Sequence, residues 1–160
     1  MKKLLKFLLV WVACTTLCAG CNNIENNDID LVEQPFEITP ILIGKGELQG
    51  REGISKQNMV ITENKDWEEL KATMNLVNNV TEKFTENTID FSKYQLIAVF
   101  EEVKNNGGWS IDITKITEYK DKIVILITNL KKGNLTSVID QPFHIVKIPA
   151  SKKEMVFENN

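Results

Sequence analysis

Residues 95–100 read Gln-Leu-Ile-Ala-Val-Phe, a continuous apolar run of the length of a β-strand. A second such run, Ile-Val-Ile-Leu-Ile, occupies residues 123–127 and favours a strand at the centre of a sheet, because it offers no polar face to solvent. Before it, residues 109–114 alternate apolar and polar side chains, which is typical of a half-buried strand. The polar residues 119–122 separate these last two segments, so we expect the pair to form a hairpin.

Four further short segments have the composition of strands. They are residues 36–43, 59–62, 143–148 and 155–157. Pro40 lies inside the first segment and removes a ladder donor, which favours a bent or edge strand, and Pro149 ends the third. Residues 44–56 are rich in glycine and are expected to form a loop.

One amphipathic helix is expected over residues 66–77. The apolar residues of one face recur at helical spacing and are Trp67, Leu70, Met74 and Val77. Such a stripe is typical of core packing rather than of a cofactor site. Asp66, with Glu69 three residues later, resembles a capping box, which predicts that the helix begins at Asp66.

These segments together predict an α+β fold. We expect a single domain, residues 35–160, in which one main amphipathic helix packs against an antiparallel sheet of about six strands. About 125 residues are enough for one domain with a substantial core. The sequence contains no internal repeat and no low-complexity block.

Residues 1–20 have the layout of a bacterial lipoprotein signal peptide. Lysines at positions 2, 3 and 6 form a positive start, and an apolar segment follows up to Leu17. This segment is too short for a membrane-spanning helix, which needs roughly 20 apolar residues. Ala19 and Gly20 supply the small residues of a cleavage site before Cys21, although Cys18 stands where an aliphatic residue is usual. The alternative is an ordinary secretory signal or an uncleaved anchor.

As a mature lipoprotein, the chain would carry a diacylglyceryl thioether on Cys21, with palmitate as an expected acyl group. Two or more acyl chains anchor a protein stably, whereas one chain does so only marginally. Residues 22–34 are polar and acidic, so we expect residues 21–34 to form a lipidated, flexible tether. The expected location is the cell envelope, with the domain anchored to the membrane and facing the periplasm or the cell exterior.

The three cysteines, Cys14, Cys18 and Cys21, all lie in the signal or at its end. The domain that follows is therefore expected to contain no disulfide and no thiol nucleophile. Removal of residues 1–20 takes three lysines from the 19 basic residues and none of the 22 acidic ones, which changes the formal net charge from −3 to −6. An acidic domain repels phosphate backbones, which argues against a nucleic-acid partner.

Two motifs resemble the PrcB protease-complex-associated family. Residues 107–113 read Gly-Gly-Trp-Ser-Ile-Asp-Ile and residues 141–149 read Gln-Pro-Phe-His-Ile-Val-Lys-Ile-Pro, similar to an early strand and the closing strand of the family's C-terminal domain. The predicted helix and residues 89–92 are also similar, so the resemblance covers residues 58–150. Residues 135–139 are shorter than the corresponding family segment and lack the cysteine of some members. The resemblance implies an accessory lipoprotein of a surface protease complex, with a binding or maturation role.

Gly107, Gly108 and Trp109 form the candidate binding loop, since paired glycines let a backbone approach a partner closely. The structural alternative is a turn or bulge in which glycine supplies a positive φ angle and Trp109 covers the core. His144 is the only histidine and lies between two apolar residues of a predicted strand, which favours a structural role. Zinc would need further histidine or cysteine ligands after Cys21, so no metal and no cofactor are predicted.

We therefore expect a non-catalytic accessory or binding protein of the envelope, whose partner is another envelope protein, for example a protease. One alternative is a protease inhibitor or small-ligand binding module that uses the Gly107–Trp109 and Gly44–Gly53 loops.

The other alternative is a hydrolase that uses His144. It would combine this histidine with Asp140 and with Ser110 or Ser137, but no Gly-x-Ser-x-Gly motif supports it. No catalytic residue is therefore predicted, and the protein is not expected to be an enzyme.

Overall fold

The computed structural model of the protein describes residues 34–160. In chain order its elements are β1 (Phe36–Glu37), β2 (Ile41–Leu48), β3 (Gln57–Ile61), α1 (Asn64–Met74), the 3-10 helix η1 (Val80–Lys83), β4 (Tyr94–Phe100), β5 (Asp112–Glu118), β6 (Lys122–Thr128), β7 (Gln141–Pro149) and β8 (Glu154–Asn159). None of the helices in this part of the chain is long and apolar enough to cross a membrane. The predicted signal peptide, the lipidation site Cys21 and the predicted tether up to residue 33 lie outside the described residues.

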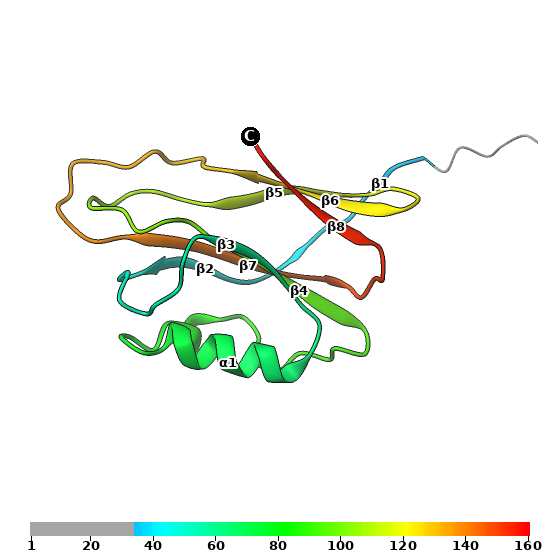
Figure 1. Ribbon diagram of the computed structural model, residues 1–160, viewed down its shortest axis with the longest axis horizontal. Coiled ribbons are helices and arrows are strands. Elements are labelled where there is room, and N and C mark those ends of the chain that lie inside the picture. Colours follow the sequence, from blue (N-terminus) through cyan, green and yellow to red (C-terminus); the bar gives the residue numbers. More distant parts are fainter. Residues whose placement is uncertain (1–33) are drawn as a thin grey trace, which may run out of the picture. The chain divides into compact units, whose positions relative to one another are not determined.

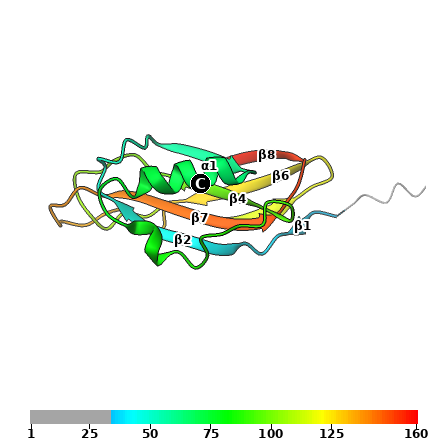
Figure 2. The same ribbon diagram turned by 90° about the horizontal axis from the view of Figure 1, so that it is seen from below.

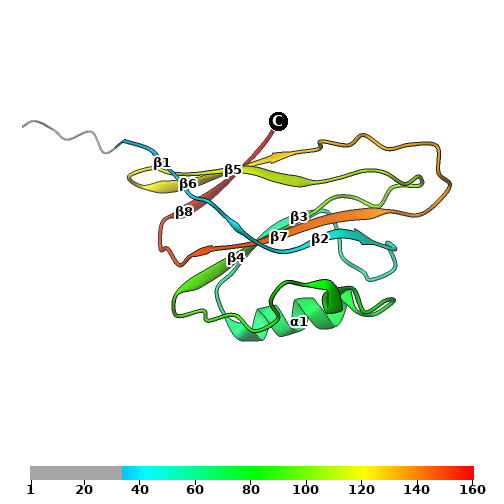
Figure 3. The same cartoon turned by 180° about the vertical axis from the view of Figure 1, so that it is seen from behind.

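The strands form two four-stranded sheets which, with α1, make three layers (Figure 1). The central sheet has the strand order β2-β7-β4-β3 and is antiparallel throughout. The outer sheet has the order β1-β5-β6-β8, and its β6–β8 pair is parallel. Helix α1 covers the face of the central sheet that points away from the outer sheet, as Figure 2 and Figure 3 show from two further directions.

Strand β4 is apolar on both faces because it is buried between two layers. Leu96, Ala98 and Phe100 point to α1 and belong to one hydrophobic core, the helix-side core. Ile97 and Val99 point to the outer sheet and belong to a second core, the inter-sheet core. All five side chains are fully buried. The continuous apolar run therefore reflects burial on both sides of one strand.

Strand β7, which pairs with β4, is buried in the same way. Phe143 and Ile145 lie in the helix-side core, while Val146 and Ile148 lie in the inter-sheet core. Because side chains alternate between the two faces of a strand, a shift of register by one residue would exchange the two sets. The two strands together set the register on which both cores depend.

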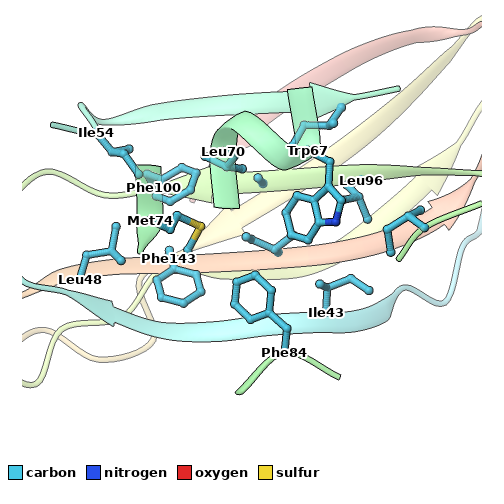
Figure 4. Close-up of a cluster of buried hydrophobic side chains, with 14 residues drawn as sticks. Ile43, Leu48, Ile54, Trp67, Leu70, Met74, Phe84, Leu96, Phe100 and Phe143 are labelled. Atoms are coloured by element: carbon cyan, nitrogen blue, oxygen red, sulfur yellow. The ribbon is translucent and has the colours of Figure 1, made fainter. Parts of the chain in front are cut away.

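The helix-side core contains four aromatic rings (Figure 4). Phe84 stacks on Trp67 with a centroid distance of 5.8 Å, and Phe143 lies 6.1 Å from Phe84 and 6.2 Å from Phe100. Trp67 is fully buried, and its Nε1–H donates to the backbone oxygen of Asn87 at 3.0 Å. The indole therefore fixes α1 on the sheet while its polar atom keeps a partner.

Pro142 lies within β7 although a proline cannot donate a ladder hydrogen bond. Its carbonyl accepts the N–H of Glu101 at 3.0 Å. The proline has no N–H, so it cannot donate a hydrogen bond to the carbonyl of Glu101 in return. The side chain of Gln141 supplies the missing donor, since its Nε2 donates to that carbonyl at 3.1 Å. A buried side chain thus compensates for the proline in an inner strand.

The predicted α+β class is confirmed, but the prediction of one antiparallel sheet of about six strands is wrong. The eight strands of the described fold divide between two sheets, and one strand pair is parallel. An apolar run indicates that a strand is buried on both faces, but it does not indicate whether a helix or a sheet covers each face. The chain crosses from the central to the outer sheet after β7, and this crossover brings β8 beside β6 in the same direction.

Helix α1 begins and ends earlier than the predicted span of residues 66–77. Its N-cap is Glu63, whose side chain makes no capping hydrogen bond, so the predicted capping box at Asp66 is wrong. Asp66 instead lies in the first turn, where its carboxylate interacts favourably with the positive end of the helix dipole. At the other end, Asn75 leaves the helix and its Nδ2 donates to Thr81 Oγ1 at 2.7 Å.

Residues 44–56 were expected to form a loop, but β2 continues through Gly44 and Gly46 and pairs with β7. A Cβ atom on Gly44 would lie 2.4 Å from two ring carbons of Phe84. On Gly46 it would lie 3.5 Å from the nearest ring atom of Phe143, which is ordinary contact. Gly44 therefore makes room for an aromatic ring on the face of a strand.

The strand predicted at residues 109–114 begins later, at Asp112, and its predicted hairpin with β6 is confirmed. An irregularity in the pairing follows Ile113, so that Ile113 and Ile116 both belong to the inter-sheet core in spite of their three-residue spacing. Trp109 precedes the strand and belongs to the site described below.

We predict that Gly44→Ala destabilises the fold by about 1–3 kcal/mol, because the added methyl group overpacks against the buried Phe84 ring. The matched control is Gly46→Ala on the same strand, which meets only ordinary contacts and should change stability little. Urea denaturation of the two variants measures the difference. Equal stabilities of the two variants would contradict the prediction, because they would show that the residues around Phe84 move to accommodate the added methyl group.

Candidate functional site

Two long loops lie at one end of the domain, on the left in Figure 1 and on the right in Figure 3. They are residues 101–111, between β4 and β5, and residues 129–140, between β6 and β7, and we call them together the loop end. Two isolated bridges join the loops, Lys104↔Asp140 and Trp109↔Lys132. The candidate binding loop, residues 107–109, lies in the first of them.

Both glycines of the candidate loop pack against the second loop. The N–H of Gly107 donates to the Thr136 carbonyl at 3.0 Å, and the carbonyl of Gly107 accepts the N–H of Asn134 at 2.8 Å. Gly108 has a φ angle of 81°, and a Cβ atom on it would lie 2.4 Å from the Asn134 side chain. The glycine pair therefore allows two loops of the same chain to approach closely.

Trp109 is half-buried and held by both loops. Its Nε1–H donates to Asn106 Oδ1 at 3.2 Å, and Lys104 Nζ lies 4.7 Å from the ring centre, in a cation–π contact. On the side of the second loop, a Cβ atom on Gly133 would lie 2.6 Å from two indole atoms. These contacts fix the indole where it lines a cavity.

The cavity beside Trp109 has a volume of about 210 Å³ and is bounded by β2, β7 and the loop end. Its charged and hydroxyl-bearing lining residues are Lys45, Glu47, Ser110, Asp112 and Lys131. Both signs of charge therefore face it. The volume lies below the range of about 300–1,000 Å³ that is usual for drug-sized ligands, and it suits a side chain or a small polar molecule.

Asp112 is the most extensively bonded acid of the cavity. Burial by itself would raise its pKa, but hydrogen bonds from Lys45 Nζ and Ser110 Oγ, with the charge of Lys45, hold the pKa below its ordinary value. The N–H of Leu130 adds a bond at 3.3 Å, and Ser110 Oγ in turn accepts the N–H of Lys131 at 2.9 Å. As a carboxylate, Asp112 thus links β2, β5 and the second loop.

Asp140 and Glu47 have a less favourable environment next to the same cavity. Burial raises the pKa of Asp140, although the backbone N–H groups of Trp109 and Gly108 favour its charged form. Its Oδ1 has no hydrogen-bond partner among the described residues, and the residue is only 1% exposed. Burial and then the charge of Asp140 raise the pKa of Glu47, while Lys131 lowers it. The loop end and the adjoining strand β2 therefore hold acidic groups whose charges are not fully compensated.

His144 is buried on the face of β7 that points to the outer sheet. Its Nδ1 accepts the backbone N–H of Ile113 at 2.9 Å and so links the two sheets. Burial and then the positive charge of Lys45 lower its pKa to about 4, and the charge of Asp112 offsets this only in part. The imidazole is therefore neutral near pH 7, with Nδ1 occupied as an acceptor.

The groups considered for a hydrolase have other hydrogen-bond partners. Ser110 Oγ donates to Asp112 at 2.6 Å, His144 accepts from the backbone, and Asp140 accepts the N–H of Trp109 at 3.4 Å. These bonds do not connect the serine to the histidine or the histidine to Asp140. Residues 34–160 also contain no group of three or more His, Cys, Asp or Glu side chains that could hold a metal ion.

The loop end carries exposed apolar side chains that sequence reasoning missed. They are Val103, Leu130, Leu135, Val138 and Ile139. Val103 and Ile139 both lie against Gly50, and Val138 lies against Gly107, so the group spreads over adjoining loops. The sequence does contain a signal for this surface. Several apolar residues lie within a segment whose turn-forming residues predict a loop. Gathered exposed apolar side chains are typical of an interaction surface.

Residues 96–149 match the family model described as PrcB C-terminal. The match runs from within β4 to the end of β7 and contains both loops of the loop end. The resemblance predicted from the two motifs is confirmed over this span, which is shorter than the predicted residues 58–150 and excludes α1. Comparisons with curated proteins and with solved structures found no match.

We predict that the free energy of unfolding decreases as the pH is lowered from 6.5 to 4, because His144 must remain neutral in the fold. The unfolded chain binds a proton there with an ordinary pKa of 6.5, whereas the folded chain does so near 4, so stability is full above pH 6.5 and decreases below it. A shift of this size corresponds to about 3 kcal/mol. Urea denaturation across this pH range measures it.

The control is His144→Gln, which removes the titrating group and should flatten the dependence above pH 5, where few carboxyl groups titrate. Because the chain has one histidine, its NMR titration needs no further assignment. An imidazole that protonates with a pKa near 6.5 in the folded protein would contradict the prediction.

Proposed function

We propose that the protein is a non-catalytic, lipid-anchored accessory protein that binds a partner in a protease complex of the cell envelope, because residues 96–149 match the PrcB C-terminal family model. The family supports a protease-associated accessory role. The lipid anchor and the envelope location rest on residues 1–21, whose signal pattern ends at Cys21.

The observation that carries the binding role is the group of exposed apolar side chains on the loop end, within the span of the family match. Leu135 is fully exposed and Leu130 is 66% exposed. Lys131 and Lys132 directly follow Leu130 in the sequence and are exposed, so charged side chains adjoin an exposed apolar one. An apolar centre with a charged rim has the composition of a protein–protein interface.

The non-catalytic character is supported by the hydrogen bonds of His144 and Ser110. The histidine uses Nδ1 to accept the N–H of Ile113, and the serine donates to Asp112. A general base must instead lie within hydrogen-bond reach of the proton that it removes. Both residues thus have roles in joining the sheets and the loops.

The inhibitor alternative receives less support. The first half of the Gly44–Gly53 segment, one of its two candidate loops, belongs to strand β2. The other, Gly107–Trp109, bonds to the second loop through Gly107 and Gly108. An inhibitory loop that enters an active site needs backbone groups free for the protease.

We predict that Leu130→Ser combined with Leu135→Ser lowers partner affinity by about tenfold or more, because central apolar side chains dominate interface energies. The tagged full-length chain is used to capture partners from detergent-solubilised envelopes, and captured proteins are identified by mass spectrometry. We expect a protease or a subunit of its complex, with recovery reduced by the double variant.

The matched control is Leu76→Ser, since Leu76 is 69% exposed but lies just beyond α1. This variant should capture as much partner as the original chain. Equal capture by all three proteins, or recovery of abundant envelope proteins alone, would count against the proposal.

We also predict that metabolic labelling with a fatty acid marks the protein and that Cys21→Ala abolishes the label. The thiol of Cys21 is the attachment point of the lipid, whereas Cys14 and Cys18 are removed with the signal peptide. Gel fluorescence of a clickable palmitate analogue measures the label. Cys18→Ala is the matched control and should keep it, and a label that persists in Cys21→Ala would exclude lipidation at this residue.

A further inference from the structure

Strand β3 forms an edge of the central sheet beside α1 (Figure 2). It pairs with β4 along its whole length, Gln57 to Ile61, without a bulge. Its sequence, Gln-Asn-Met-Val-Ile, contains no charged residue, proline or glycine. Natural proteins usually protect an edge strand with such residues or with bulges, because its free backbone groups can pair with another chain.

The other edges of the described sheets are covered, short or charged. At the far edge of the central sheet, the N–H of Thr85 donates to the Ile43 carbonyl at 2.9 Å, and Thr85 Oγ1 donates to the Leu42 carbonyl at 2.6 Å. In the outer sheet, β1 has only two residues and β8 carries Glu154 and Glu158. Strand β3 is therefore the least protected edge in the part of the chain that the structure describes.

The hydrogen bonds of β4 determine which backbone groups of β3 point outward. In an antiparallel sheet, the backbone groups of successive residues bond alternately to the two neighbouring strands. The N–H of Glu101 bonds to Pro142, and the carbonyl of Lys93 accepts from Ala150. Odd-numbered residues in this region therefore bond towards β7, and even-numbered residues of β4 bond towards β3.

The register then fixes the outward-facing residues. The β3 residues opposite even-numbered β4 residues are Gln57, Met59 and Ile61. The backbone N–H and C=O groups of Asn58 and Val60 consequently point away from the sheet. These donors and acceptors have the spacing that a further strand requires.

A groove between β3 and α1 runs beside these backbone groups. It has a volume of about 310 Å³, and its apolar lining includes Met59, Ile61 and Leu70. Its opposite wall includes Asp66 and Glu69 on the helix. A strand added to β3 would place every second side chain on the helix side, next to this groove.

The charge of the groove favours a basic occupant. Asp66 and Glu69 are exposed, and the ion pair of Glu69 with Lys65 is long, at 3.9 Å, and exposed. Residues 22–33 of the same chain are acidic and would be repelled, and a second copy would bring the same two carboxylates to the interface. Both alternatives are therefore less favourable than a basic segment of another protein.

We propose that the β3 edge and its groove bind an extended, basic segment of a partner protein, which adds to the central sheet as a further strand. Main-chain hydrogen bonds at Asn58 and Val60 hold the segment, and its basic side chains meet Asp66 and Glu69. This site is separate from the loop end and does not depend on a protease being the partner.

The test uses the full-length chain in detergent and two labelled peptides. One is acetyl-Thr-Lys-Thr-Val-Thr-Lys-Thr-amide, whose lysine and valine side chains share one face, and the other has glutamate in place of both lysines. We expect the lysine peptide to bind about tenfold more tightly at low salt, with the preference decreasing as salt is added. Amide hydrogen exchange should slow at Asn58 and Val60 when this peptide is present.

Asn58→Pro removes one outward N–H and should weaken binding by about tenfold, since a strand hydrogen bond is lost. Asn58→Ala is the matched control, because it removes the same exposed side chain but keeps the N–H, and it should bind normally. Should the proline variant fail to fold, Asp66→Lys with Glu69→Lys on the exposed helix surface tests the same site. That variant should prefer the glutamate peptide.

Three outcomes would overturn the proposal. Unchanged exchange at Asn58 and Val60 would place the peptide elsewhere. Equal binding by the proline and alanine variants would exclude strand addition. A dimer in light scattering that Asn58→Pro dissociates would assign the edge to a second copy of this chain. The capture of partners by Leu130 and Leu135 variants is a separate measurement. A negative result for the β3 edge therefore does not test the proposal for the loop end.

Discussion

The burial of β4 and β7 on both faces is the constraint on which the rest of the structure depends. Each strand supplies apolar side chains to the helix-side core and to the inter-sheet core at once. Helix α1 buries its apolar face in the first of these cores, and the outer sheet buries its own in the second. Pairing between β4 and β7 therefore sets the register of both cores, and a slip there would place Phe143 and Val146 on the wrong faces.

Three polar side chains of β7 that enter this doubly buried centre make hydrogen bonds or ion pairs with other segments. Gln141 replaces the donor that Pro142 lacks, His144 accepts a backbone N–H from the outer sheet, and Lys147 pairs with Glu86. Towards the loop end the compensation is less complete, because Asp140 Oδ1 and Gln141 Oε1 lack hydrogen-bond partners among the described residues. The buried polar atoms without partners therefore lie where the second loop of the loop end joins β7.

The two candidate binding surfaces lie at the margins of this doubly buried centre. The strands position two surfaces of different chemistry, a loop end with exposed apolar side chains and a backbone edge with an acidic groove. The first surface lies within residues 96–149, the span of the PrcB C-terminal match, whereas β3 and α1 lie outside it. The same fold therefore carries one candidate binding surface within the matched residues and a second one outside them.

The sequence alone determined the strands at residues 95–100, 123–127 and 143–148 and the buried face of the helix, because apolar spacing is a local property of a strand or helix. It also indicated the candidate loop at residues 107–109 through its glycine pair. Only the tertiary structure decided which layer covers each face of β4, the parallel direction of β8, the need for Gly44 beside Phe84 and the approach of apolar residues of the two long loops to each other at Gly50. Each of these depends on segments that are distant in sequence, and no local pattern of residues records such contacts.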